Sequence, residues 1–491
     1  MKTFRPYSPE QSYLLPPSPR EWLPKGHLAF FILGLLDELD LGAIERVVHA
    51  KDPRGERPYS PAMMTSLLLY AYATGVYSSR RIERACVEDV AFRVLASGEQ
   101  PHFTTINLFR AVHLEALSGL FVQVLQVCQS EGLVKLGHVA IDGTKMKANA
   151  SKHKAMSYDR MEKDEVRLRA EIQEWFETAQ AIDAEEDKAE GTYDPQEEIR
   201  RREERLAKMA RVKEALKKEV AEARAKRLRE QAEELRKQTE NATLSPRKRK
   251  ELGTLAKKRD HQASLFNDDQ DPPPPSADAD LPRNVPPHRP DGTPKPKAQR
   301  NFTDPDSRVM LRDGAWLQAY NAQAAVDEEH QIIVAAAVSN QAPDSEYFVP
   351  MLRRVVGNCG AVPERVTADS GYFSAAAVAY AEHVGVEPFI AVGKHHNDGS
   401  PTGGAPLPQH RTEARVAMRA VLETERGRLA YARRKATVEP VFGQIRTPRR
   451  FGQFSFRGVF KNHCEWLLVC LTHNVLKLWR ARRPRLQLAT A

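Results

Sequence analysis

Two aspartates in the sequence stand where a carboxylate needs a physical reason. Asp142 ends the short apolar run that starts at Leu136, and Asp369 ends a second run that starts at Arg365. A carboxylate taken out of water without a partner costs several kcal/mol, so each must reach solvent or be compensated. Taken singly, each is typical of a strand-end cap. Two of them on strands that can lie side by side indicate a site for a divalent cation, because carboxylates are the hard oxygen ligands of such ions.

Glu439 is the third candidate, in a segment crowded with basic residues between Arg433 and Arg446. Pro440 follows it, and proline is tolerated in the first turn of a helix. We therefore expect a helix that begins near Thr437, unless Pro440 kinks a longer one. A glutamate in a first turn is also an ordinary partner of the helix dipole. The surrounding cations favour a site that handles phosphate.

The elements expected around these acids alternate between strands and helices. Period-two patterns and β-branched residues predict strands, and apolar residues at three- and four-residue steps predict helices. The strands are expected at 136–149, 316–326, 331–338, 365–369 and 387–392, and the helices at 345–356, 374–384 and 461–482. This order predicts an α/β fold with a mixed sheet, interrupted once.

The chain divides by composition into five parts. Residues 1–130 read as all-helical: Ser60-Pro61 starts one helix, and Ser78-Ser79 precedes another. The short helices suit either a DNA-binding module of the helix-turn-helix kind or a plain packing domain. The expected parts are a helical domain at 1–130, a discontinuous core at 131–158 and 301–482, a charged helical insertion at 159–270 that resembles a hairpin or coiled coil, a linker at 271–300 with ten of the 33 prolines, and a basic tail at 483–491.

Charge is concentrated near the end of the chain. The net charge is +9, and the last 46 residues hold ten basic residues against one acid. A polyanionic partner is one explanation, and a solvated basic tail is the other. The longest apolar run, Leu28–Leu36, is far shorter than the ~18 residues of a membrane span. Five cysteines without a CxxC pair argue against a disulfide framework or a zinc ribbon, so we expect a reducing cytoplasm.

Three segments resemble the signature regions of bacterial insertion-sequence transposases of the DDE type. They are Ala140–Ser151, Thr367–Phe373 and Val438–Arg446. Other stretches are similar as well: Tyr77–Arg84 and Thr104–Arg110 resemble the helical amino-terminal domain of that family, and Tyr320–Asp327 and Arg457–Trp466 its later segments. The resemblance covers most of the chain outside the charged insertion.

The resemblance implies an RNase H-like core in which Asp142, Asp369 and Glu439 are both the catalytic residues and the metal ligands. Two Mg²⁺ ions, replaceable by Mn²⁺, would activate the attacking oxygen and stabilise the leaving one. The family commonly has lysine seven positions after the glutamate, where this chain has Arg446, and tends to have an acid where this chain has His102. Both lysine and arginine meet a phosphate, arginine bidentately.

The basic residues near these segments are the expected contacts to double-stranded DNA. They are Arg434, Lys435, Arg446, Arg449, Arg450, Arg80, Arg81, Arg84, Lys145 and Lys147.

The leading hypothesis is a DNA transposase that binds terminal inverted repeats, cuts the element ends and joins them to target DNA. Because two ends must meet, it implies a homodimer or a larger homo-oligomer, associated with the bacterial nucleoid. Two alternatives stay open: a metal-dependent, structure-specific nuclease on the same core, and a domesticated DNA-binding protein without catalysis. The presence of all three acids argues against the last.

Overall fold

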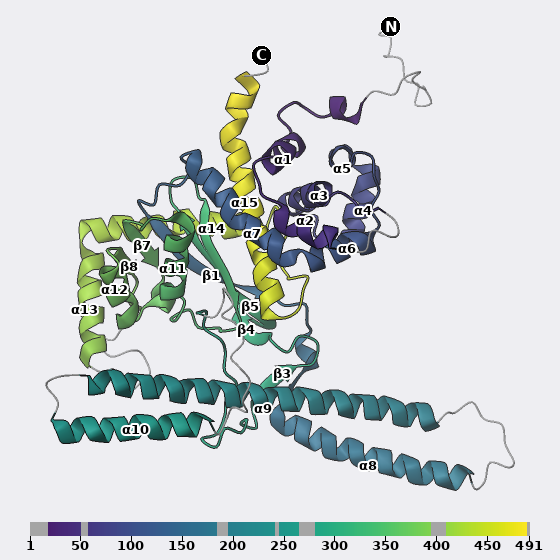
Figure 1. Ribbon diagram of the computed structural model, residues 1–491, viewed down its shortest axis with the longest axis vertical. Helices are drawn as coiled ribbons and strands as arrows, with labels where there is room; N and C mark the ends of the chain where they lie inside the picture. Colours follow the sequence, from purple (N-terminus) through teal and green to yellow (C-terminus); the bar gives the residue numbers. More distant parts are fainter. Residues whose placement is uncertain are drawn as a thin grey trace.

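The protein consists of a helical amino-terminal part, an α/β core and a long helical arm (Figure 1). The computed structural model describes residues 18–50, 57–183, 195–240, 245–264, 280–393 and 409–488. The pair His395-His396 stands in a segment rich in glycine and proline, which predicts surface residues, and it lies outside the described residues.

The amino-terminal part is helical, as its sequence predicts. The side chain of Ser60 caps α3 by accepting from the N–H of Met63, and Gly75 ends that helix with a φ of +83°. The expected start of α4 after Ser78 is confirmed. The helices are α1 (Leu28–Leu36), α2 (Gly42–His49), α3 (Pro61–Thr74), α4 (Ser79–Glu88), α5 (Val90–Leu95), α6 (Phe103–Val112) and α7 (Leu114–Ser130).

Within the described residues, no single helix has the length and apolar composition needed to cross a membrane. The pair α6 and α7 reaches that composition only when the two are taken together, and the pair is bent by 68°.

A mixed sheet forms the core and confirms the predicted α/β class. Its central strand β1 (Val139–Lys147) pairs antiparallel with β5 (Ala315–Asp327) and parallel with β7 (Arg365–Ala368), which pairs parallel with β8 (Glu387–Ile390). On the other side of β5 lie β4 (Arg308–Arg312) and β6 (Ile333–Ser339). The helices α11 (Phe348–Cys359) and α12 (Ala375–His383) connect the later strands, close to their predicted positions.

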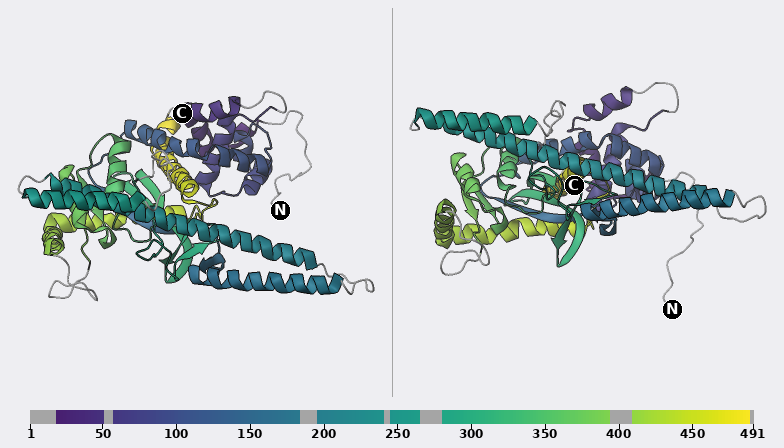
Figure 2. Two further views of the ribbon diagram at one scale, coloured as in Figure 1. Left: turned by 60° about the horizontal axis from the view of Figure 1, so that its bottom comes forward. Right: turned by 90° about the horizontal axis from the view of Figure 1, so that it is seen from below.

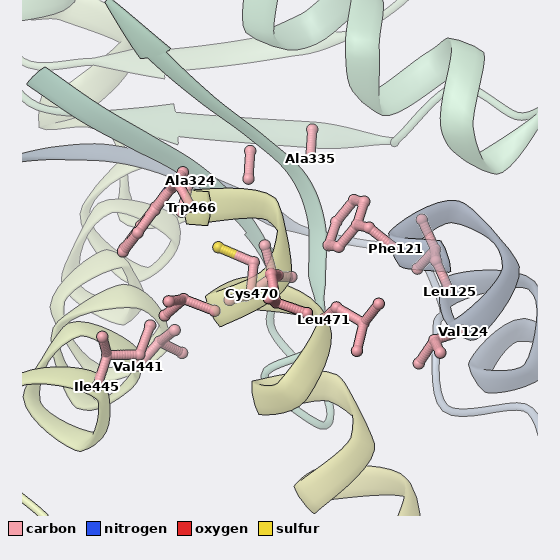
Figure 3. Packing of buried hydrophobic residues seen from close by; sticks show 14 of the residues in the cluster. Phe121, Val124, Leu125, Ala324, Ala335, Val441, Ile445, Trp466, Cys470 and Leu471 are labelled. Carbon is pink, nitrogen blue, oxygen red and sulfur yellow. The ribbon is translucent and has the colours of Figure 1, made fainter. Parts of the chain in front are cut away.

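The carboxy-terminal helix α15 (Val459–Leu488) holds the parts together. Figure 3 shows Trp466, Cys470 and Leu471 of α15 between side chains of the sheet, of α7 and of α14. Trp466 is fully buried, and its indole N–H donates to the backbone oxygen of Gln323 in β5 at 2.9 Å. Since a buried tryptophan contributes a large apolar area, this contact fixes α15 on the sheet.

The charged insertion is a pair of helical hairpins that share one long helix. Its helices are α8 (Tyr158–Asp183), α9 (Pro195–Thr239) and α10 (Pro246–Ser264). The 45 residues of α9 span about 67 Å, and Figure 2 shows them running past the core at both ends. Lys213 of α9 binds Glu165 of α8, and Arg236 of α9 binds Asp260 of α10. Near its middle, α9 is anchored by Glu219, which accepts from the guanidinium groups of Arg300 and Arg308.

The proline-rich segment packs on the core from residue 280 onward, although its composition suggests a linker. Leu281 is buried, the hydroxyl of Ser339 donates to the backbone oxygen of Pro282, and the N–H of Asn284 donates to Asn340 Oδ1 at 2.9 Å. Residues 271–279 lie outside the described part of the chain.

The helix that carries Glu439 is long and runs through Pro440. It is α14 (Glu425–Arg446), capped by Thr424, so the expected start near Thr437 is wrong and the alternative of a longer helix holds. Proline has no N–H for the carbonyl of Ala436 four residues earlier. The side-chain amide of Gln331 donates to that carbonyl at 3.0 Å instead. The preceding helix α13 (Gln409–Glu423) was not expected from the sequence.

Arg449, just after α14, joins the amino-terminal helices to the core. Its guanidinium donates to the backbone oxygens of Tyr72 in α3 and Val469 in α15 and to the hydroxyl of Thr472. A Cβ at Gly75 would lie 2.6 Å from the backbone oxygen of Arg449, so this close approach requires glycine.

We expect the substitution Arg449→Ala to lower the free energy of unfolding by about 3 kcal/mol, because three buried acceptors lose a charged donor. The matched control is the neighbouring, exposed Arg450. The substitution Arg450→Ala should change the free energy of unfolding by less than about 0.5 kcal/mol. Thermal and urea unfolding of both variants measure this. Equal stabilities would show that Arg449 does not join the two parts.

Candidate active site

Asp142 and Asp369 lie side by side where the parallel pairing of β1 with β7 ends. Ile141 of β1 pairs with Ala368 of β7. Asp142 directly follows Ile141, and Asp369 directly follows Ala368. Neighbouring strands are about 4.8 Å apart, so the two side chains share one small volume. Burial raises the pKa of Asp142 above its ordinary value, and Asp369 adds to the rise, whereas the N–H of Gly143 and Arg434 oppose it.

Arg434 supplies the positive charge that compensates this pair. Its Nη1 donates to Asp142 Oδ2 at 2.9 Å, and the two side chains are 9% and 19% exposed. Burial alone would lower the pKa of Arg434, but the charge of Asp142, with smaller effects of Tyr431 and Asp369, holds this pKa above its ordinary value. Arg434 and Asp142 thus form a largely buried ion pair.

Glu439 does not join the two aspartates in this structure. It is exposed on α14, next to the buried Val438, and no hydrogen bond or ion pair among the described residues connects it to Asp142 or Asp369. Within the described part of the chain, no group of three or more His, Cys, Asp or Glu side chains lies close enough to hold a metal ion. The structure brings together two of the three predicted carboxylates, and α14 places the third on a helix that packs against β1 and β7.

The two aspartates nevertheless fit a divalent cation by their chemistry. They are adjacent oxygen donors, and a cation, the guanidinium of Arg434, already compensates Asp142. The third ligand is what the present arrangement lacks.

A fourth acid, Asp344, lies on the opposite face of β1 and was not expected from the sequence. It accepts from Lys145 Nζ at 3.1 Å, from Asn321 Nδ2 at 2.6 Å and from Gln323 Nε2 at 2.9 Å. Lys145, an expected DNA contact, is therefore bound within the protein. The only local signal is the Pro343-Asp344 pair ahead of α11, which reads as an ordinary helix start.

This cluster reaches the turn that follows Asp369. The hydroxyl of Tyr372, which is fully buried, donates to Gln323 Oε1. A Cβ at Gly143 would lie 2.3 Å from Gln323 Nε2, and one at Gly371 would lie 3.5 Å from Asp344 Cβ. The bare backbone at Gly143 thus lets the side-chain amide of Gln323 pack directly against β1, one residue from Asp142.

The expected DNA contacts fall into two groups. Arg80, Arg81, Arg84, Lys147, Lys435 and Arg450 are exposed, and Arg446 is half-buried, with an Nε that has no hydrogen-bond partner among the described residues. The other group is turned inward. Arg449 is 3% exposed and its Nε and Nη2 donate within the core, so its expected role in DNA binding is replaced by a structural one.

Gln331, in the turn between β5 and β6, fixes α14 and α15 relative to the sheet. Its side chain donates to Ala436 in α14, while its Oε1 accepts from Lys477 in α15. Its backbone oxygen lies 3.0 Å from Nε2 of His473, also in α15, and burial lowers the pKa of His473 to about 3. The position of Arg434 and Glu439 thus depends on this turn.

Two families match the chain. Residues 17–112 match the Transposase domain (DUF772), and residues 293–475 match the Transposase DDE domain, so that together the matches span more than half of the chain. Asp369 and Glu439 lie within the second match, and Asp142 lies between the two. Comparison with curated proteins gives no match, and comparison with solved structures gives none either.

The two matches, in this order along one chain, define a transposase. The chain belongs to the DDE-type transposases of insertion sequences.

We expect the substitution His473→Gln to weaken the acid sensitivity of the fold. Folded His473 stays neutral down to a pKa of about 3, whereas the unfolded side chain takes up a proton near its ordinary value of 6.5. The contribution of neutral, buried His473 to the free energy of unfolding is therefore fully present above pH 6.5 and is lost as the pH falls toward 3. The loss between pH 7 and pH 5 is about 2 kcal/mol. Urea unfolding at both pH values should show that loss reduced in the variant. An identical loss in both proteins would contradict the burial of a neutral imidazole.

Proposed function

We propose that the protein acts on the ends of an insertion sequence: it binds the terminal inverted repeats, cuts the element from its flanks and joins it to target DNA. The observation that carries the proposal is the pair Asp142 and Asp369 on adjacent parallel strands, with Arg434 as their cationic neighbour. The strand order β6-β5-β1-β7-β8, antiparallel up to β1 and parallel beyond it, supports an RNase H-like core.

Asp142 and Asp369 would hold divalent cations, Mg²⁺ by preference, with Glu439 as the third ligand. When bound, these ions activate the attacking oxygen and stabilise the leaving oxygen at phosphorus. For Glu439 to complete the set, its side chain or α14 has to turn toward the sheet, and Arg434 has to release Asp142. Arg434, Lys435 and Arg446 lie on the same helix and then bind backbone phosphates.

The reaction has two displacements at phosphorus. In the first, the oxygen of a water molecule forms a bond to the scissile phosphorus, the bond to the 3′ oxygen breaks, and that oxygen leaves as a hydroxyl. In the second, this 3′ hydroxyl loses its proton and attacks a phosphorus of the target strand, which releases a 3′ oxygen of the target. Both steps would take place at the same site, beside Asp142 and Asp369.

The arm and the quaternary structure follow from the same proposal. Two element ends have to be held at once, so the active form is a homodimer or a larger homo-oligomer that works on the nucleoid in the cytoplasm. The hairpins of α8, α9 and α10 extend beyond the core, and we propose that they contact a second copy or clamp the DNA.

We expect Asp142→Asn, Asp369→Asn and Glu439→Gln each to lower cleavage and joining by at least about 100-fold while DNA binding persists. The assay uses a labelled fragment with the element's own end and Mg²⁺. The matched control is Glu364→Gln, at the opposite end of β7 from Asp369 and exposed, which should act like the wild type.

Three other results would each revise the proposal. Cuts without joined products would favour the structure-specific nuclease. Binding without any metal-dependent cutting would favour a DNA-binding protein. Full activity of the Glu439→Gln variant alone would remove Glu439 from the ligand set.

A further inference from the structure

A groove of about 850 Å³ separates the amino-terminal helices from the core. It is lined by the first turn of α4, by one face of α6, by Asn149 and by residues 453–455; Figure 1 labels both helices. Asn149 follows β1 seven residues after Asp142, which places the groove about 23 Å from the aspartate pair along the strand direction. The groove is thus separate from the candidate active site.

The start of α4 opens into this groove without a cap. Ser78 is the N-cap residue, yet its side chain accepts no hydrogen bond from the first turn. The first N–H groups of a helix have no partner within the helix and carry the positive end of its dipole. In a helix of ten residues, such an end is suited to an anion.

Ser79 gives an independent indication of a ligand. The residue is 8% exposed and lines the groove, and its Oγ is buried without a hydrogen-bond partner among the described residues. Buried hydroxyl groups are normally hydrogen-bonded, because the loss of water is otherwise uncompensated. An oxygen acceptor bound in the groove would satisfy this hydroxyl.

The charged side chains that line the groove are basic. Arg80 and Arg110 line it, and none of the described residues that line it is acidic. Arg80 is exposed, with its guanidinium 4.7 Å above the ring centroid of Phe103. Arg110 is buried, donates to the backbone oxygen of Tyr77 at 2.8 Å and interacts with the buried carboxylate of Glu465, so the accessible positive charge of the groove is that of Arg80. Donors and positive charge together fit a phosphate.

We propose that this groove binds a backbone phosphate of the element's DNA, with the first turn of α4, the hydroxyl of Ser79 and the guanidinium of Arg80 as the donors. At about 3.4 Å per base pair, this distance corresponds to about seven nucleotides from the cleaved bond. The proposal rests on the proposed function, because the DNA end has to lie across both the aspartate pair and the groove. It would hold α4 against the same DNA that the core cuts.

The test uses Ser78→Asp, which separates folding from binding. An aspartate at this position caps the helix well, since Ser78 already has the extended backbone of an N-cap. Its carboxylate would also occupy the place of the phosphate and repel it. We expect an unchanged or higher melting temperature and affinity for the element end at least about tenfold lower. Ser78→Asn, a neutral cap of the same shape, should lose less affinity.

Ser79→Ala should weaken binding about tenfold, through loss of a hydrogen bond to a charged group, and Arg80→Ala should lower the salt dependence by about one phosphate contact. The control is Val87→Ala, an exposed site in the last turn of α4, which should bind like the wild type. The readout is a binding titration at several salt concentrations.

Neutral methylphosphonates, placed one at a time in the DNA, locate the contact. In the wild type, one replacement about seven nucleotides from the cut should weaken binding, and in the Ser78→Asp variant the same replacement should change the affinity little. Wild-type affinity and salt dependence in both Ser78→Asp and Ser79→Ala would overturn the groove proposal. If the wild type itself does not prefer element ends over unrelated DNA, the proposed function fails instead.

Discussion

The ion pair between Arg434 and Asp142 is the interaction on which the rest of the core depends. Two aspartates at one sheet edge repel each other and lose hydration, and burial raises the pKa of Asp142 accordingly. The buried guanidinium from α14 offsets that cost at 2.9 Å. A helix that lies elsewhere would leave an uncompensated buried charge. The charge of the site therefore helps to position α14, and any cation that replaces Arg434 has to supply the same compensation.

The position of α14 also depends on a side-chain hydrogen bond that replaces a missing backbone hydrogen bond of the helix. Pro440 leaves the carbonyl of Ala436 without its helical donor, and Gln331 from the β5–β6 turn provides one. The same turn holds α15 through Lys477 and His473. A proline that by itself would weaken a helix is thus used to connect that helix to the sheet, six positions after Arg434. Pro440, where α14 lacks one backbone hydrogen bond, directly follows Glu439, whose side chain has to turn if it is to meet the aspartates.

Much of the fold could be predicted because its signals are local. The cap at Ser60, the glycine at 75 and the period-two pattern around Asp142 each depend on a few neighbouring residues, and the strand pairing puts Asp142 beside Asp369 as their sequence positions suggest. The start of α14 was not predictable in this way, because Pro440 is acceptable there only through Gln331, more than a hundred residues away. Asp344 was missed for the same reason, since its three donors come from two other strands.

The basic carboxy-terminal segment shows that a count of charged residues does not tell which of them are exposed. Arg449 is used inside the core, and Arg482 binds Glu38 of the amino-terminal part and Glu131. Lys477 donates to Gln331. Three of the ten basic residues of this segment are therefore used within the protein, whereas Arg450, Arg457, Lys461, Arg480 and Arg483 are exposed. Positive charge also remains accessible on α4, at the end of β1 and along α14, where a DNA end held by both parts of the chain would need it.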